Sequence, residues 1–155
     1  MNKVAIAFLT KDRVELSKRT IEPLLQRDKF DLIWIDGSAT KEGRDLPTSY
    51  PVHQIHHDVG GGPDAAVAYA LTVMLEARTS AGIKQGDMVG PDGTVPAYDY
   101  VGLCESDVLL DEDWFDQTMA LFDRGRVDGL EVGAVSARAY EDRILCQRDG
   151  YALMH

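Results

Sequence analysis

Short apolar runs recur along this chain, separated by polar stretches, and they constrain its fold more than any other feature. They cover residues 4–9, 31–35, 52–56, 100–104 and 130–135. The first, second and fourth runs are nearly continuous in apolar residues, which is typical of strands covered on both faces in a parallel sheet. This pattern argues against a half-exposed antiparallel sheet.

Segments with helical spacing lie between these runs. We expect Asp12 to cap a first helix that Pro23 kinks or splits, because proline removes a backbone donor and disfavours helix at the residue before it. A second helix is predicted to begin at Pro63, directly after the glycines of residues 60–62. A third is predicted to begin at the acidic residues 111–113. Its buried residues are expected to be Phe115, Met119 and Phe122. Strands alternating with helices predict right-handed β-α-β units and an α/β sandwich.

Two stretches depart from this alternation. Residues 80–99 are rich in glycine and proline and predict a long turn-rich connection, a kind of loop that is often functional. Residues 150–155 are largely apolar and carry no helix stop signal. We interpret residues 1–155 as one domain that is truncated at its C-terminus, or whose end packs against a partner.

Composition narrows the classes of partner and compartment. The 155 residues include 26 acidic and 16 basic side chains, a formal net charge of −10. This charge argues against nucleic acid or an anionic membrane as the main partner. The apolar runs are too short for a membrane span, and the N-terminus does not resemble a signal peptide. With Cys104 and Cys146 far apart in the sequence, we expect free thiols and a cytoplasmic location.

Polar groups follow four of the predicted strands, at residues 10–12, 36–38, 58–64 and 105–107. In open α/β sheets, ligands bind beyond the carboxyl ends of the strands. The sharpest group holds Glu105 and Asp107, whose carboxylates point to one side if the extended geometry persists. Two such oxygen donors can hold Mg²⁺ or Mn²⁺, which would bridge the phosphates of a nucleotide. The alternative is a solvated loop in which Asp107 serves a cap or turn.

The order of these pieces resembles the nucleotide-binding half of a family 2 glycosyltransferase, with the GT-A fold. The resemblance lies in Thr10 at the end of one strand, Asp36 at the end of the next, the glycine-led helix at residues 60–71, and the acid-x-acid motif at residues 105–107. It covers residues 3–140 and implies a three-layer α/β/α sandwich with a mostly parallel, Rossmann-like sheet. The chain departs from the family in its glutamate at the first acid of the motif and in its long connection before that motif.

The resemblance also implies roles for individual residues. Asp36 would hydrogen-bond the base or ribose of a nucleotide-sugar, Thr10 would line the same pocket, and Asp64 would approach the base or ribose. Glu105 would face the ribose or a metal-bound water, and Asp107 would ligate Mn²⁺ or Mg²⁺. The implied activity is transfer of a sugar to a saccharide or other hydroxyl acceptor, with inversion. Only 48 residues follow Asp107, so the catalytic base is expected to be missing from this chain.

Other patterns leave alternatives open. The glycines at residues 60–62 form either a flexible turn beside the pocket or a phosphate contact, although they lack the lysine of a P-loop. Strand alternation places His53 and His57 on one face and His56 on the other, so we do not expect them to share a metal. Trp34 is expected in the core. The basic residues after the fifth run, Arg138, Arg143 and Arg148, favour a solvated face over a diphosphate contact, and His155 is a candidate metal ligand.

Two other functions remain as alternatives to a glycosyltransferase. One is a nucleotidyltransferase, which would normally carry a glycine-rich loop with a basic residue after its first strand, where this chain has residues 8–11 (FLTK). The other is a non-catalytic module, either a degenerate nucleotide-sugar domain or a flavodoxin-like interaction domain. The missing acceptor region favours this last possibility.

Overall fold

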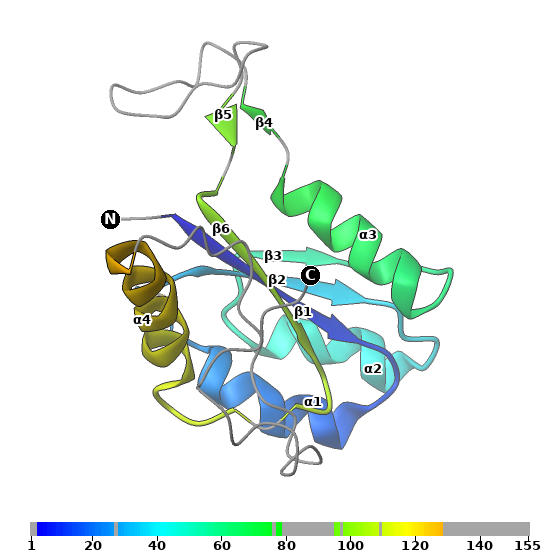
Figure 1. Ribbon diagram of the computed structural model, residues 1–155. Helices are drawn as coiled ribbons and strands as arrows, with labels where there is room; N and C mark the ends of the chain where they lie inside the picture. Colours follow the sequence, from blue (N-terminus) through cyan, green and yellow to red (C-terminus); the bar gives the residue numbers. More distant parts are fainter. Residues whose placement is uncertain are drawn as a thin grey trace. The chain divides into compact units, whose positions relative to one another are not determined.

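The computed structural model describes residues 3–26, 28–75, 77–78, 95–96, 98–108 and 110–128. The chain divides into two compact units, Met1–Leu109 and Leu110–His155. Figure 1 labels the helices and strands. The predicted strand at residues 130–135, together with Arg138, Arg143, Cys146, Arg148 and His155, lies outside the described residues.

The first unit is built on a four-stranded sheet. Its strands are β1 (Val4–Thr10), β2 (Asp31–Asp36), β3 (Gln54–His56) and β6 (Tyr100–Glu105). They lie in the order β3-β2-β1-β6, and every pair is parallel. The prediction of an α/β chain with a parallel sheet is therefore confirmed. The third strand is shorter than expected and begins at Gln54.

The strand order reverses direction once. From β1 the chain continues to β2 and β3 on one side, and later returns to place β6 on the other side of β1. The reversal therefore falls between β1 and β6. Doubly wound sheets bind their ligands at this point, outside the carboxyl ends of the strands.

Alternation along the strands separates two apolar faces. On one face, Ala7 and Ile33 belong to a buried cluster with Ala70 and Met74 of α3 (Pro63–Met74). On the other face, the rings of Phe8 and Trp34 meet edge to face, with centroids 4.8 Å apart. All seven residues of β1 are buried, which explains why this segment is apolar at nearly every position.

The connection from β1 to β2 confirms one expectation and corrects another. Helix α1 (Val14–Ile21) is followed by the 3₁₀ turn η1 (Glu22–Leu24), so the segment is split at Pro23 as predicted. Asp12 does not cap α1. Its φ of 54° turns the chain before the helix, and its carboxylate accepts hydrogen bonds from the backbone of Ala39 and Thr40 instead. The Asp12 carboxylate therefore bonds a loop that is distant in sequence and does not bond the start of α1.

A short helical segment after β2 was missed in the sequence. It comprises α2 (Lys41–Asp45) and the 3₁₀ turn η2 (Leu46–Ser49). Thr40 caps α2, with its Oγ1 accepting from the Gly43 backbone N–H at 3.2 Å. A five-residue helix is too short to show a hydrophobic period, so only the capping threonine could have indicated it.

The glycine-led turn and the long connection are partly described. Gly61 and Gly62 have φ values of 94° and 87°, and Pro63 occupies the first turn of α3 as predicted. Two short antiparallel strands, β4 (Ala77–Arg78) and β5 (Val95–Pro96), bracket the connection. Residues 79–94 between them lie outside the described part.

In the second unit the described structure is α4 (Trp114–Val127). Phe115 is buried, whereas Met119 and Phe122 are half-buried, so the predicted apolar side of this helix is present. Within the described residues, no helix combines the length and apolar character needed to cross a membrane.

Candidate functional site at the carboxyl edge of the sheet

Asp36 is the centre of the polar groups at the carboxyl edge. Its side chain is fully buried, with 0% exposed, at the end of β2. One carboxylate oxygen, Oδ1, accepts from the Ser38 backbone N–H at 3.0 Å and lies 3.3 Å from Thr10 Oγ1. The other, Oδ2, lies 3.2 Å from His57 Nδ1. A single carboxylate thus joins the end of β1 to the loops that follow β2 and β3.

The orientation of the Thr10 hydroxyl is determined by Trp34. The indole Nε1–H of Trp34 donates to Thr10 Oγ1 at 2.7 Å, and an indole nitrogen can only donate. Thr10 oxygen is therefore the acceptor in that bond, and its own proton is available to Asp36. The structure brings Thr10 and Asp36 into contact but encloses both side chains within the protein, and their role toward a nucleotide stays a prediction.

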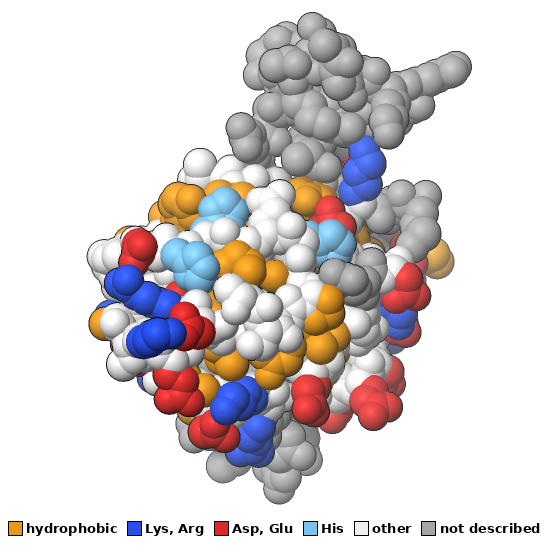
Figure 2. Space-filling view, turned by 180° about the vertical axis from the view of Figure 1, so that it is seen from behind, with side chains coloured by type: hydrophobic (Ala, Val, Ile, Leu, Met, Phe, Trp, Pro, Cys, Tyr) orange, Lys and Arg blue, Asp and Glu red, His pale blue; other side chains and the backbone are white. Residues whose placement is uncertain are grey.

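His57 is the residue of this cluster that sequence reasoning missed. We considered it only as part of a metal site with His53 and His56, yet the three histidines have different partners. Figure 2 shows histidine side chains, in pale blue, at the surface. His53 contacts Asp31 and the Leu32 backbone, and His56 contacts Tyr69. Only the strand register of the structure reveals the contact. Ile35 pairs with His56, so the residues that follow them, Asp36 and His57, lie side by side at the ends of β2 and β3.

Backbone contacts hold the loop that carries His57. Val59 N–H donates to the Asp36 carbonyl at 3.1 Å, and Gly37 N–H donates to the Thr10 carbonyl at 2.9 Å. A Cβ on Gly37 would lie 2.9 Å from the Val59 carbonyl oxygen, so this close approach requires glycine. Asp58 has a φ of 60° and forms an ion pair with Arg44 at 2.9 Å.

Asp12 ties the loops after β1 and β2 together. Its carboxylate accepts from Thr40 N–H at 2.9 Å, from the Thr40 hydroxyl at 2.7 Å and from Ala39 N–H at 3.0 Å. Its backbone N–H donates to Ser38 Oγ at 2.9 Å. The Thr40 backbone bond, followed by the Thr40 hydroxyl and the Ala39 bond, holds the pKa of Asp12 below its usual value. These bonds are therefore made by the ionised carboxylate and weaken only as it is protonated in acid.

The end of β6 is organised differently. The strand ends at Glu105, and Ser106 and Asp107 form a turn. Ser106 is buried, whereas Glu105 and Asp107 are exposed. The extended geometry that would point both carboxylates to one side therefore does not persist. Asp107 forms an ion pair with Arg13, from the loop after β1. This pair joins the segments that follow the neighbouring strands β1 and β6, where the strand order reverses.

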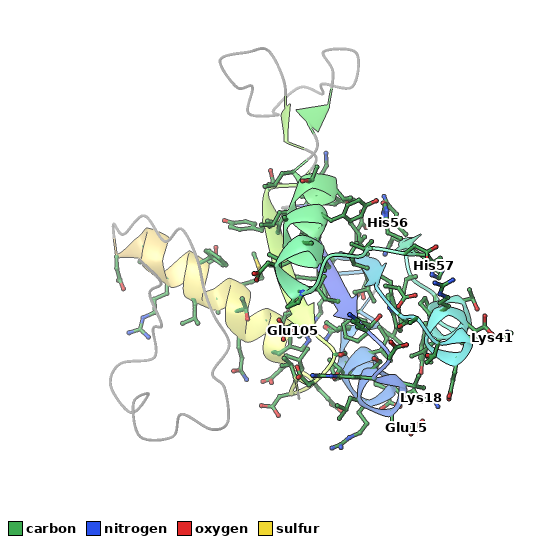
Figure 3. All side chains as sticks on the ribbon, turned by 90° about the vertical axis from the view of Figure 1, so that its right-hand side faces the viewer. Glu15, Lys18, Lys41, His56, His57 and Glu105 are labelled. Carbon is green, nitrogen blue, oxygen red and sulfur yellow. The ribbon has the colours of Figure 1, made fainter. Side chains whose placement is uncertain are left out.

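The remaining predicted residues lie apart from the Asp36 cluster. Asp64 is exposed in the first turn of α3. Figure 3 shows Glu105 and His57 on opposite sides of the carboxyl edge, as the strand order requires. Among the described residues, no three His, Cys, Asp or Glu side chains are arranged to hold a metal ion. The oxygen donors of Glu105 and Asp107 still suit Mg²⁺ or Mn²⁺, because such ions often bind to one or two carboxylates plus substrate phosphates.

A groove of about 550 Å³ is formed mainly by α1 and the segment α2–η2. Its two basic side chains already have acidic partners within their own helices, Lys18 with Glu15 and Lys41 with Asp45. The Glu15 contact raises the pKa of Lys18. This groove is therefore a weaker candidate for an anionic ligand than the carboxyl edge.

Comparison of the chain with protein-family models and with curated proteins finds no match. Any functional conclusion therefore depends on the residues and the geometry described above.

Proposed function

We propose that this chain is the donor-binding part of a metal-dependent glycosyltransferase, which binds a nucleotide-diphosphate-sugar at the carboxyl edge of its sheet. The observation that carries this proposal is the strand order β3-β2-β1-β6 together with the acidic residues at the ends of β2 and β6. The proposal places the ligand where open α/β sheets bind ligands. The fold that accompanies it is the three-layer, Rossmann-like sandwich of the GT-A type.

The metal would be held by Asp107 and Glu105 at the end of β6. Both side chains are exposed, and both offer the oxygen donors that Mg²⁺ and Mn²⁺ prefer. When bound, the cation would neutralise charge on the leaving nucleoside diphosphate. It would also allow a chain with a net charge of −10 to bind an anionic donor.

Arg13 gives this site a positive group that is already present. It pairs with Asp107, and both side chains are substantially exposed, at 57% and 41%. Exposed ion pairs contribute little to stability, so this one can open at small cost. We assign Arg13 to the diphosphate, since guanidinium groups bind phosphate oxygens well. Asp107 would then be available to the cation.

Asp36 and Thr10 receive a positioning role in this proposal. Because both side chains are enclosed, they hold the ends of β1 and β2 in place, while exposed neighbours contact the nucleoside. Asp64 is one such exposed neighbour on α3. The sugar acceptor would be a saccharide or another hydroxyl compound, and the group that deprotonates it is not assigned to this chain.

The test is calorimetric titration of nucleoside diphosphates into the folded chain, with Mn²⁺ and with a chelator. We expect one nucleotide to bind only with Mn²⁺, and Asp107→Asn to weaken that binding at least about tenfold, as expected for loss of a charged interaction. Asp45→Asn is the matched control, because Asp45 is also an exposed acid in an ion pair. Unchanged affinity in Asp107→Asn would remove the metal role.

The second candidate is a non-catalytic interaction module. The enclosure of Asp36 favours it, since both oxygens of this carboxylate are already bound by the chain's own groups. Failure of every nucleotide to bind, with or without Mn²⁺, would favour this module over the transferase.

A further inference from the structure

The protonation pattern around Asp36 determines which ring nitrogen of His57 carries hydrogen. The Ser38 backbone N–H donates to Asp36, and the Thr10 hydroxyl proton is directed to it because Trp34 occupies the Thr10 oxygen. Both of these groups bond Oδ1, which therefore acts as an acceptor. His57 Nδ1 lies 3.2 Å from the other oxygen, Oδ2, and toward an ionised carboxylate it makes a favourable contact only as a donor.

This arrangement makes the other ring nitrogen, Nε2, a hydrogen-bond acceptor. In a neutral imidazole with its hydrogen on Nδ1, Nε2 carries a lone pair and can only accept. The His57 side chain is 38% exposed, and no residue in the described part of the chain forms a hydrogen bond with Nε2. Figure 3 shows His57 beyond the end of β3, at the carboxyl edge of the sheet.

The ring is also held in place before any ligand arrives. The Val59–Asp36 backbone bond fixes the loop on one side of His57 to β2, and the Asp58–Arg44 ion pair ties the same loop to α2. The carboxylate of Asp36, which has no solvent exposure, contacts the ring at Nδ1. The edge therefore presents a preoriented acceptor that a ligand can contact without rearranging the protein, which favours binding.

We propose that His57 Nε2 contacts the base of the bound nucleotide and selects bases that carry a ring N–H on their pairing edge. This inference rests on the proposed nucleotide-binding function. Uracil, thymine and guanine present a ring N–H that can donate to Nε2. At the equivalent ring positions, cytosine and adenine present a lone pair, which would face the lone pair of the histidine. Asp36 is then a positioning residue, since it acts on the base through the His57 tautomer.

Matched pairs of nucleotides test the selection directly. UDP and CDP differ in ring hydrogen-bonding pattern but hardly in size, and GDP and ADP form a second pair. In Mn²⁺, and in whichever pair binds, we expect the member with the ring N–H to bind about tenfold more tightly, the usual effect of one hydrogen bond made or lost. Equal affinities, or tighter binding of CDP or ADP, would overturn the role of His57 while leaving the proposed function intact. Absence of binding by all four would overturn both.

Variants separate His57 from its neighbours. His57→Gln should lose the preference, because a glutamine amide both donates and accepts, and circular dichroism checks that the variant is folded. His56→Gln is the matched control, since His56 contacts Tyr69 rather than Asp36, and should retain the preference. Loss of the preference in the His56 variant alone would overturn the assignment.

A measurement on the unmodified protein needs no ligand and no variant. Nitrogen-15 NMR of the histidine side chains reports which ring nitrogen is protonated. We expect the neutral ring of His57 to be the Nδ1–H tautomer. An Nε2–H tautomer would overturn the inference even if nucleotides bind.

Discussion

The two halves of the carboxyl edge differ in how they hold their acidic side chains. At the ends of β1 and β2, the Asp36 carboxylate is buried and bound by groups from three segments. At the end of β6, Glu105 and Asp107 remain exposed, and Asp107 has one partner, Arg13, which is also exposed. Burial makes an unsatisfied polar group expensive, whereas water can satisfy an exposed one.

This difference indicates which half can change when a ligand binds. Opening the Asp36 cluster would leave several buried groups without partners, so it is suited to hold loops in place. Opening the Arg13–Asp107 pair exchanges one exposed contact for another at little cost. We therefore expect the buried half to keep the loops in place, and the exposed half to release its ion pair in favour of a ligand.

The largest effect is expected from Asp36→Ala. This change leaves the Ser38 N–H, the Thr10 hydroxyl and the His57 ring without their acceptor, and should lower the free energy of unfolding by about 3 kcal/mol. Urea denaturation measures the loss. Asp64→Asn, at an exposed acid, is the control and should cost about 0.5 kcal/mol or less. Equal losses in the two variants would contradict the contrast between buried and exposed halves.

A smaller loss of stability is expected where the loop after β2 approaches the loop after β3, at Gly37 and Val59. In Gly37→Ala the new Cβ would lie 2.9 Å from the Val59 carbonyl oxygen, and relieving this clash should cost about 1–2 kcal/mol. Gly60→Ala is a matched control, because a Cβ there meets nothing within 4 Å. Thermal unfolding of the two variants compares them. A Gly37 variant as stable as the Gly60 variant would show that this contact is not tight.

The hydrogen bond from half-buried Tyr98 to Asp31, near the start of β2, gives an intermediate case. Burial, together with the Tyr98 hydroxyl bond to Asp31 at 2.9 Å, raises the pKa of Tyr98 to about 12. A raised pKa means that its stabilisation is present below the ordinary value of 10.0 and is lost as pH rises toward 12. Between these pH values the wild type should lose about 1 kcal/mol more than Tyr98→Phe, after allowance for solvent screening. Identical alkaline unfolding curves would argue against the shift.

The smallest effect on stability is expected in the exposed half. Arg13→Ala removes the partner of Asp107 and should change the free energy of unfolding by less than about 0.5 kcal/mol. With Mn²⁺ present, the same variant should bind its nucleotide about tenfold more weakly, because a phosphate contact is lost. Calorimetry and urea denaturation on one preparation give both values. A large loss of stability with unchanged nucleotide affinity would reverse the roles we assign to the two halves.

Local sequence was sufficient to predict much of the framework. Continuous apolar runs predicted a parallel sheet, and the backbone chemistry of Pro23, Pro63 and the glycines at residues 60–62 predicted where helices split or begin. Thr10 and Asp36 could be placed at one edge because parallel strands bring their carboxyl ends together. These are properties of single residues or of short periodic patterns, which need no knowledge of distant contacts.

Tertiary structure alone decided how the site is assembled. The full burial of Asp36, the contact of its carboxylate with His57, and the pairing of Arg13 with Asp107 join residues that are 21 to 94 positions apart. Asp12 shows the same competition, since its carboxylate binds Thr40 rather than the start of α1. A polar side chain takes whichever partner the packed chain brings nearest, and strand register and loop placement determine that partner.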